Sequence, residues 1–312
     1  MGKKGKAGPP KGPPIPVPWG SRIAADEDPT APPRFELNKG TKCGWTTPEE
    51  PLRPDHEWEP AAPGGWRKVQ AAWNAAWHGD VATITKLAGA GAALGEAHPD
   101  DGTTPFFICC AAYGAGGASK NSVEIATKLQ EEGVDINAAN KVGVTPLSVA
   151  CSRENLDLVK FLLGTGKVKV DKADDNKETA LFAASNNGKV RAARLLVQAE
   201  ADVDLANSEG RSALHAAAAR GHAPIVRLLC DSGASVDTAD SAGDTPLLLA
   251  AAQGRRRAVL LLLEHGAALS STNGAGLTPL AAALKHKHFE VATVLETAQR
   301  SQESLTALAA EL

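Results

Sequence analysis

Apolar residues recur along the chain in a two-part pattern that is copied several times. Each copy opens on a Thr or Ser and continues into a run rich in Leu and Ala, as in "DTPLLLAAAQGR" and "RSALHAAAARGH". A second, Leu-rich run such as "IVRLLCDSGASVD" follows shortly after. The opening residues, at positions 104, 145, 179, 212, 245 and 278, are separated by 41, 34, 33, 33 and 33 residues. Self-similarity at this period predicts stacked pairs of short helices, one pair in each repeat.

The residues around these runs fit helix ends and tight turns. A Thr or Ser before the first helical residue caps the helix, and the Pro that often follows it is pre-organised for the first helical position. Alanines in the first helix let it approach the next repeat, while the Leu stripe of the second helix fills the core. A turn-forming Asn or Asp follows each Leu-rich run and precedes the next copy. These turn residues are Asn140, Asp174, Asn207, Asp240 and Asn273.

The combined pattern resembles the ankyrin repeat, whose copies carry a T-P-L-H box, a G-H step between two helices, a Leu pair and a closing G-A-x-V-N/D. The fullest copy is "GRSALHAAAARGHAPIVRLLCDSGASVDTAD", residues 210–240, and a degenerate first copy spans 66–94. The resemblance covers residues 66–297 as seven repeats. It implies an all-α ankyrin-repeat solenoid of helix-turn-helix repeats with β-turn or hairpin connections, which offers a concave face to partners.

Some segments depart from the repeat pattern. The second repeat contains an extra stretch, "YGAGGASKNS" at 113–122, which predicts a flexible loop between its two helices. Residues 298–312 place three leucines near one helical face and are predicted to form a C-terminal capping helix over the last repeat. We expect distorted turns at Lys177 and Glu200, which replace turn glycines. Two further residues replace the glycine between paired helices, which makes four positions without the expected glycine. They are Glu154, Lys177, Glu200 and Lys287.

Residues 1–65 are predicted to form an extended tail ahead of the solenoid. They hold 14 of the chain's 20 prolines, so helix and sheet are not expected there. The first 22 residues carry five basic residues and no acid, whereas residues 23–65 carry nine acids and four bases. A short basic cluster of this kind indicates either contact with an acidic surface or a solubilising tail.

The tail and the first helix also hold all six tryptophans of the chain, at positions 19, 45, 58, 66, 73 and 77. Spaced aromatic residues on a proline-stiffened ribbon suit docking, because each buried Trp removes about 150–250 Å² from water. We expect Trp19 to contact another molecule. We expect the three tryptophans of the first helix to face the open side of the first repeat, and Trp58 to fold back onto that side. Trp45 either joins Trp58 there or binds a partner.

Composition narrows the class of protein. Hydrophobic residues make up 43% and charged residues 22%, and the formal net charge is −3, which does not suit a protein that coats nucleic acid. We find no apolar run as long as a membrane span and no secretory signal. Five cysteines without a C-x-x-C pair fit a reducing, intracellular compartment. Cys109, Cys110 and Cys151 stand where other repeats carry alanine, which favours small core residues.

The sequence shows no convincing catalytic constellation. His215 occupies the box position at which the family's histidine makes structural hydrogen bonds, and the "HKH" at 286–288 has no further metal ligands at a suitable spacing. We therefore expect the protein not to be an enzyme and to bind no cofactor or metal. An enzyme that uses Cys109 or His215 is the alternative. Activity that is lost in Cys109→Ala or His215→Ala, with stability retained, would support it.

Two sets of exposed positions are the candidate partner-binding residues, together with Trp19 and Trp45. The first is a stripe at the end of each first helix, expected on the concave face: Arg153, Asn187, Arg220, Gln253 and His286. The second is a basic ridge along the loops between the helices of the last three repeats, which could receive an acidic partner. It consists of Arg220, Arg255, Arg256, Arg257, Lys285 and Lys287. The alternative for this second set is a solvated face whose arginines lie along apolar surface.

These features together predict an adaptor or scaffold that binds other proteins through its concave face and its tail. We expect it to be a subunit of a larger intracellular assembly, with a cytoplasmic, cytoskeletal or ciliary location. The alternative is a regulatory inhibitor that masks an enzyme or a transcription factor. The expected partners are proteins, some with an acidic surface. A small-molecule substrate, a membrane, nucleic acid and homo-oligomerisation are not expected, and the fold alone does not fix the partner.

Overall fold

The computed structural model describes residues 65–112 and 121–310 as fourteen helices joined by turns. The helices fall into seven consecutive pairs, one pair in each repeat. They are α1 (Gly65–His78), α2 (Val81–Gly89), α3 (Pro105–Ala111), α4 (Ser122–Glu131), α5 (Pro146–Arg153), α6 (Leu156–Gly164), α7 (Ala180–Asn186), α8 (Val190–Gln198), α9 (Ala213–Arg220), α10 (Ala223–Asp231), α11 (Pro246–Ala252), α12 (Arg256–Glu264), α13 (Pro279–Lys285) and α14 (Phe289–Ala310).

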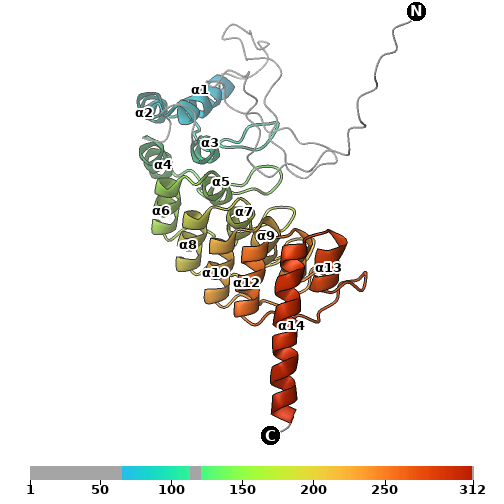
Figure 1. The fold of residues 1–312 in the computed structure, drawn as a ribbon. Coiled ribbons are helices and arrows are strands. Elements are labelled where there is room, and N and C mark those ends of the chain that lie inside the picture. Colours follow the sequence, from blue (N-terminus) through green and yellow to red (C-terminus); the bar gives the residue numbers. More distant parts are fainter. Residues whose placement is uncertain (1–64, 113–120, 311–312) are drawn as a thin grey trace, which may run out of the picture.

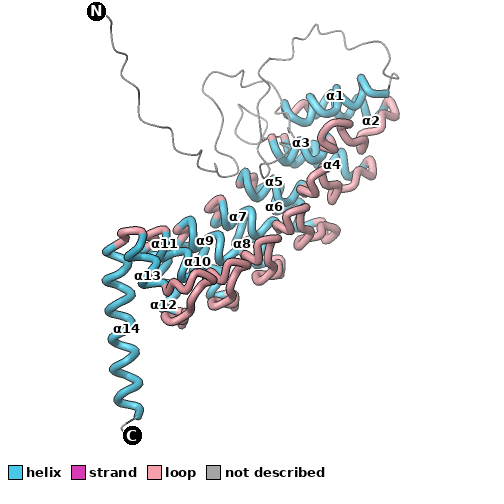
Figure 2. Tube along the Cα trace, turned by 90° about the vertical axis from the view of Figure 1, so that its right-hand side faces the viewer, coloured by secondary structure: helices cyan, strands magenta, loops and turns pink. Residues whose placement is uncertain are grey.

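The helices form two layers (Figures 1 and 2). Consecutive odd-numbered helices contact one another, consecutive even-numbered helices do the same, and each even-numbered helix packs on the odd-numbered helix before it. The stack bends toward the odd-numbered helices, so these line its inner, concave face (Figure 1). The predicted all-α solenoid is confirmed for the described residues, which contain no strand.

The predicted caps start the odd-numbered helices. Thr145 precedes Pro146 with an extended backbone, and its Oγ1 accepts a hydrogen bond of 3.1 Å from the N–H of Ser148. The same bond, from the N–H three residues on, is found at four further threonines. They are Thr104, Thr179, Thr245 and Thr278. Each cap satisfies one of the unpaired N–H groups at a helix start, which fixes where the helix begins.

The Leu stripe of the even-numbered helices forms the centre of the core, as predicted. One leucine of each of the last five even-numbered helices is at most 1% exposed. These are Leu162, Leu196, Leu229, Leu262 and Leu295. Alanines of the odd-numbered helices, such as Ala217 and Ala250, are fully buried against the next repeat. A single core therefore runs through the whole stack, as expected when no repeat can bury its apolar face alone.

Four cysteines of the described residues lie in this core. Cys109, Cys110 and Cys151 are fully buried, which confirms them as small core residues, and Cys109 Sγ donates to the carbonyl oxygen of Ser122 at 3.1 Å. Burial raises the pKa of the Cys109 thiol to about 12 and also raises the pKa values of Cys110 and Cys151. Thiols held in this protonated state are poor nucleophiles. Cys43 lies outside the described residues.

The turns that lack glycine are not distorted, contrary to our expectation for Lys177 and Glu200. Glu154, Lys177 and Glu200 each have a φ of 60°, and Lys287 has a φ of 63°. Glycines at the equivalent positions of other repeats, such as Gly188 with a φ of 70°, occupy the same left-handed region. Each substituted residue therefore accepts the strain of this conformation, about 1–2 kcal/mol for a residue with a Cβ, and keeps the turn.

The strain predicts a stabilising substitution. We expect Glu200→Gly to raise the free energy of unfolding by about 0.5–1 kcal/mol, because glycine adopts the left-handed conformation without the steric cost, less its larger entropy when unfolded. Glu200 is exposed. Glu200→Ala is the matched control, since it removes the carboxylate and keeps the strain. Urea denaturation of both variants measures the difference, and equal stabilities would show that the turn is not strained.

The C-terminal end of the solenoid and its insertion differ from the predicted bounds. The division predicted at residue 298 falls inside α14, which runs without a break to Ala310 and leaves the stack as a single rod (Figures 1 and 2). Residues 299–304 of this helix are exposed. In the predicted insertion, residues 113–120 lie outside the described residues, whereas Asn121 is the N-cap of α4 and Ser122 is its first residue. None of the described helices combines the length and the hydropathy needed to span a membrane.

The first repeat is tied to the second by a tryptophan. The Nε1 of Trp73 donates to Thr103 Oγ1 at 3.1 Å, and Thr103 Oγ1 donates to Asp101 Oδ1 at 2.7 Å. Trp73 is only 8% exposed, and Trp77 packs against the same core. The prediction that the tryptophans of α1 face the open side is therefore wrong for Trp73, which points toward the second repeat.

Candidate protein-interaction surfaces

The turns that precede the odd-numbered helices are built around the predicted Asn and Asp residues. Asn207 Oδ1, for example, accepts hydrogen bonds from the N–H groups of Glu209 and Arg211 at 2.9 and 3.0 Å. Equivalent pairs of bonds are found at the other four positions. These are Asn140, Asp174, Asp240 and Asn273. One side-chain oxygen thus closes each turn and holds its tip in a fixed shape.

Backbone hydrogen bonds join the tips of successive turns. The N–H of Ser241 donates to the carbonyl oxygen of Glu209 at 2.9 Å, and the N–H of Gly274 donates to that of Ala242 at 2.8 Å. The same bond links Ser208 to Asn176 at 2.8 Å. The turn tips therefore form one continuous row along the stack.

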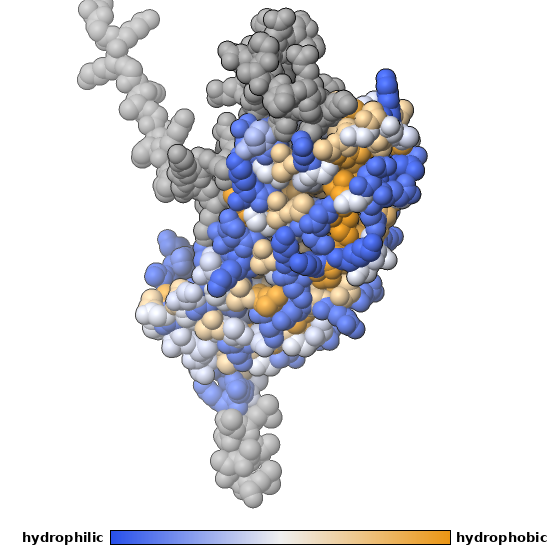
Figure 3. Space-filling view, turned by 180° about the vertical axis from the view of Figure 1, so that it is seen from behind, coloured by the Kyte–Doolittle hydropathy of each residue, from blue (hydrophilic) through white to orange (hydrophobic). Residues whose placement is uncertain are grey.

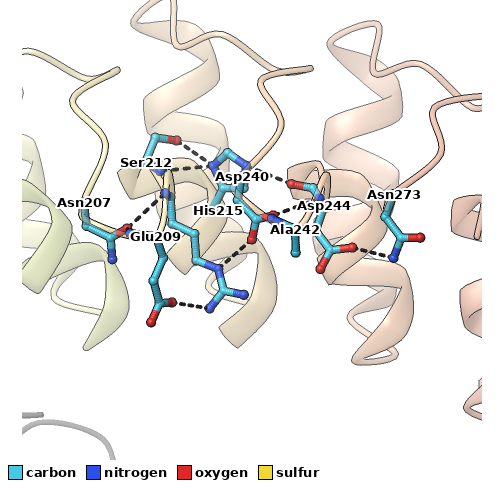
Figure 4. Close-up of polar contacts among 9 residues, drawn as sticks. Asn207, Glu209, Ser212, His215, Asp240, Ala242, Asp244 and Asn273 are labelled. Atoms are coloured by element: carbon cyan, nitrogen blue, oxygen red, sulfur yellow. Dashed lines mark hydrogen bonds and ion pairs between the residues drawn. The ribbon is translucent and has the colours of Figure 1, made fainter. Parts of the chain in front are cut away.

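His215 connects the fifth and sixth repeats (Figure 4). Its side chain is fully buried, its Nδ1 accepts from the N–H of Ser212 at 3.1 Å, and its Nε2 lies 3.2 Å from the carbonyl oxygen of Asp244. Because Nδ1 accepts, the proton sits on Nε2, which donates to Asp244. This confirms a structural role for His215. Burial lowers the pKa of the imidazole, so the neutral form is favoured.

This burial predicts a pH dependence of stability. A histidine whose folded pKa lies below its unfolded value of 6.5 stabilises the fold above pH 6.5, and the contribution is lost as the pH falls through 6.5 toward the folded pKa. The free energy of unfolding of the wild type should therefore fall between pH 7.5 and pH 5, and we expect His215→Gln to lose less over the same range. Urea titrations at the two pH values measure both losses. His222 acts in the same direction, since burial lowers its pKa, whereas bonds to Leu261 and Asp231 raise the pKa of His265 and oppose it.

The control for this experiment is His286→Gln, which changes an exposed histidine. If His215→Gln and His286→Gln leave the same slope of stability against pH, then His215 does not carry the acid sensitivity.

A charged contact supports the same junction (Figure 4). Arg211 Nε donates to Asp240 Oδ2 at 2.8 Å, and Arg211 Nη1 lies 3.0 Å from Glu209 Oε2. The Asp240 side chain is 1% exposed. Burial alone would raise the pKa of its carboxyl, but the bonds from Arg211 and from the backbone of Asp244 and Ala242 outweigh it and hold the pKa below its usual value. Asp240 is therefore charged at neutral pH.

The structure divides the predicted concave stripe into two parts. Arg153 is half-buried, and its burial lowers the guanidinium pKa. Asn187 donates through Nδ2 to the carbonyl oxygen of Ala183 at 2.9 Å, so its amide caps its own helix. The stripe is exposed in the last three repeats. The exposed members are Arg220, Gln253 and His286.

The floor of the inner face is apolar and partly exposed. Ala183, Ala219, Leu249 and Ala252 lie on odd-numbered helices and are neither buried nor fully exposed. Their neighbours on the opposite side of the same helices, such as Ala217, are fully buried. The inner face therefore combines an accessible apolar floor with polar side chains at one edge.

The predicted basic ridge consists of exposed side chains on three adjacent loops. Arg220, Arg255, Arg256, Arg257, Lys285 and Lys287 are all exposed. Seen from the side opposite to Figure 1, hydrophilic side chains cover most of the described surface and apolar ones show between them (Figure 3). Sequence reasoning missed two features here, which are the packing of Arg255 on the preceding loop and the exposure of Leu260 and Phe289.

The remaining candidates are the tryptophans of the tail and possible metal ligands. Trp19, Trp45 and Trp58 lie outside the described residues, so their docking roles stay predictions. Within the part of the chain that the structure describes, no group of three or more His, Cys, Asp or Glu side chains is placed to hold a metal ion. The surfaces just described are thus the features that bear on function.

Comparison with known families agrees with the architecture. A model of ankyrin repeats, three copies in length, matches residues 72–167, 115–207, 155–240, 184–273 and 236–306. The chain belongs to the ankyrin-repeat family. Ankyrin repeats form protein–protein interaction domains.

Three relatives share segments of similar sequence with this ankyrin-repeat protein. They are "Probable E3 ubiquitin-protein ligase XBOS33" of Oryza sativa subsp. japonica (38% identical over 81 residues, 26% of this chain and 15% of the relative), "Putative E3 ubiquitin-protein ligase XBAT34" of Arabidopsis thaliana (35% over 86 residues, 27% and 23%), and "Ankyrin repeat and LEM domain-containing protein 1 homolog" of Caenorhabditis elegans (36% over 75 residues, 24% and 10%). The matches span less than a quarter of each relative's length.

These matches correct one expectation. We expected the protein not to be an enzyme, and this is contradicted because two of the relatives are named as ubiquitin ligases. The expectation rested on the lack of a catalytic constellation in the sequence, and the candidates considered lie mainly in the repeats. Segments like these occur in chains that are named as enzymes, so the repeats do not decide the question.

Proposed function

We propose that the protein is a scaffold or adaptor that holds partner proteins on its inner face, within a larger intracellular assembly. The observation that carries the proposal is the partly exposed apolar floor of Ala183, Ala219, Leu249 and Ala252. Such a floor gains free energy when a partner covers it, at about 25 cal/mol for each Å² of apolar area. The exposed Arg220, Gln253 and His286 at its edge would supply polar contacts and orientation.

The rigidity of the stack also supports this role. The turn tips are joined by backbone hydrogen bonds and His215 ties adjacent repeats, so the inner face is preformed. A preformed surface avoids the entropy of ordering upon binding. A long, rigid face with several repeats suits the holding of one extended partner or of two partners side by side.

The proposal is tested by blocking the inner face. Ala183→Arg places a long charged side chain on the floor at a position that is not fully buried, so the fold should tolerate it. Gln198→Arg is the matched control, since it adds the same charge at the exposed end of α8. Proteins retained by the tagged full chain are compared by quantitative mass spectrometry.

We expect Ala183→Arg to lose the partners that Gln198→Arg keeps. The same partners recovered at equal levels with both variants would rule out the inner face. A stable subunit should also stay bound to its assembly at a fixed stoichiometry through salt washes, whereas exchange during the washes would favour the regulatory alternative.

A further inference from the structure

A second surface of the molecule carries positive charge that the protein itself does not neutralise. It comprises the loops between the paired helices of the last three repeats and the start of the helices that follow, and we call it the C-terminal basic face. Its members are Arg220, Arg255, Arg256, Arg257, Lys285, Lys287, Leu260 and Phe289. The loops 219–223, 252–257 and 285–288 contain no acidic residue.

Ion pairs elsewhere in the described residues leave this face out. Within the described residues, a carboxylate lies within 4.0 Å of Lys128, Lys189, Arg211 and Arg227, none of which belongs to this face. The six cations of the C-terminal basic face are all exposed. Clustered exposed cations repel one another, and an anionic ligand would remove this repulsion.

Packing between the loops keeps these cations together. The stem of Arg255 lies on Gly221, since a Cβ added to Gly221 would stand only 2.7 Å from Arg255 Cδ. The ring of His288 covers Gly254 in the same way, at 2.6 Å from such a Cβ to Nδ1. Each loop therefore rests on the loop before it, and the charges form one continuous strip.

Two of the arginines are held in place with donors to spare. Arg220 Nε donates to Asn186 Oδ1 at 3.2 Å, and Arg255 Nε donates to the carbonyl oxygen of Ala219 at 3.1 Å. Among the described residues, these bonds engage only the Nε of either group. The Nη donors remain available, and two guanidinium N–H groups match the two oxygens of a carboxylate.

The start of α12 adds to the positive potential. Arg255 precedes the helix, Arg256 and Arg257 begin it, and its first turn has no acid. A helix start carries a partial positive charge and favours acidic residues, by about 0.3–1 kcal/mol each. Three of the described helices carry an acid in the first turn, namely Glu124 in α4, Asp157 in α6 and Glu290 in α14. Three arginines at the start of α12 are therefore unfavourable in the free protein.

Exposed apolar side chains adjoin the cations. Phe289 is 65% exposed and Leu260 is 46% exposed, which places them among the few large apolar residues that the described surface exposes. Leu260 follows Arg256 by one helical turn, on the same side of α12. Phe289 begins α14, which packs against α12. The face thus offers an apolar contact beside its charges, which a uniform polyanion would not use.

We propose that the C-terminal basic face binds an acidic, extended segment of a partner protein that carries an aliphatic or aromatic side chain. The carboxylates pair with the arginines, and the apolar side chain covers Phe289 and Leu260. This surface shares Arg220 with the edge of the inner face but contains none of the floor residues, so the two surfaces have separate apolar contacts.

The probe is a fluorescein-labelled peptide, EDEELFEDLE, titrated with the full chain and followed by fluorescence anisotropy. A second peptide, EDEESSEDSE, has the same charge and no apolar anchor. We expect the first peptide to bind more tightly. Added salt should weaken both, because exposed charges are screened over about 10 Å at 0.1 M ionic strength.

Two variants dissect the face. Arg256→Gln with Arg257→Gln should weaken both peptides by about fivefold to tenfold, as the loss of two exposed charge contacts would. Phe289→Ser should weaken only the anchored peptide, by about fivefold or more. The matched control, Arg191→Gln with Arg194→Gln, removes two exposed charges from α8 and should leave both affinities unchanged.

Several outcomes would overturn the proposal. If the α8 control weakened peptide binding as much as the Arg256 and Arg257 substitutions do, binding would depend on the net charge of the protein and not on this face. An oligo-uridine RNA or a phosphatidylserine vesicle that binds as tightly as the anchored peptide, with no effect of Phe289→Ser, would give the face to another class of ligand. Self-association that the Arg256 and Arg257 substitutions abolish would identify a second copy of the chain as the ligand of this face. Displacement of the probe by a peptide of residues 45–60 would identify the chain's own tail as the ligand. Ala183→Arg should not affect the peptides, so the two proposals fail separately.

Discussion

A Gly243→Ala variant is expected to lose about 3 kcal/mol of unfolding free energy, a large share of the stability of an ordinary domain. Gly243 has a φ of 81°, and its turn tip lies against the next one. A Cβ there would stand 2.8 Å from the backbone N of Gly274 and 3.1 Å from the Cα of Asn273. These are backbone atoms, so relief requires the two repeats to separate and strains the bond from Gly274 to Ala242.

Gly233→Ala separates the two causes of this loss. Gly233 has a φ of 86°, but a Cβ there would meet nothing within 4 Å. The variant should therefore lose only the conformational part, about 1–2 kcal/mol. Urea denaturation of both variants tests the difference. Equal losses would mean that the turn tips can move apart without cost, and the row of tips would then not couple the repeats.

An Asp240→Ala variant is the second large effect, with an expected loss of about 2–4 kcal/mol. Asp240 Oδ1 accepts from the N–H groups of Ala242 and Asp244, both at 2.9 Å, and Oδ2 accepts from Arg211. Alanine removes both acceptor oxygens and so all three hydrogen bonds at once. Two backbone donors of the turn and the Nε of Arg211 then lack partners, while Arg211 Nη1 keeps Glu209, and the junction between the fifth and sixth repeats loosens.

Asp240→Asn is the informative control, because Asn140, Asn207 and Asn273 close the same turn in other repeats. The amide oxygen keeps both backbone bonds, and only the ion pair with the partly exposed Arg211 is weakened. We expect a loss below about 1 kcal/mol. Thermal and urea unfolding would show it, and similar losses for Asn and Ala would place the stabilisation in the ion pair instead of the turn.

Much of the fold could be predicted from the sequence because the deciding interactions are local. The Oγ of Thr145 reaches an N–H three residues away, and the oxygen of Asn207 reaches N–H groups two and four residues away. Such contacts leave a fixed residue type at a fixed spacing, which self-similarity makes visible. The fully buried positions of Leu196 and Leu229 follow from the same register.

The parts that could not be predicted depend on neighbours far along the chain. Asn187 and Gln253 occupy the same register, yet the first bonds back to its own helix and the second is exposed. Trp73 was expected on the open side, but its indole finds a hydroxyl 30 residues away. Glu200 keeps a glycine turn because the surrounding repeats fix the backbone, and this constraint leaves no mark in the local sequence.

The candidate surfaces show the same division. The six cations of the C-terminal basic face follow from their spacing. Their lack of carboxylate partners, and the exposure of Phe289 beside them, depend on which side chains the stack brings close. Charge could therefore be predicted from sequence, whereas the apolar anchor became visible only in the structure.

The packing of each loop on a glycine of the preceding loop has a consequence for the length of the protein. His222 covers Gly188, Arg255 covers Gly221 and His288 covers Gly254, so a His ring and an Arg stem pack at equivalent positions. Removal of residues 245–277 would bring His288 onto Gly221 and restore a junction of a type already present. The solenoid can thus lose one whole repeat and restore the packing, whereas a deletion that is not a whole number of repeats would leave a glycine uncovered.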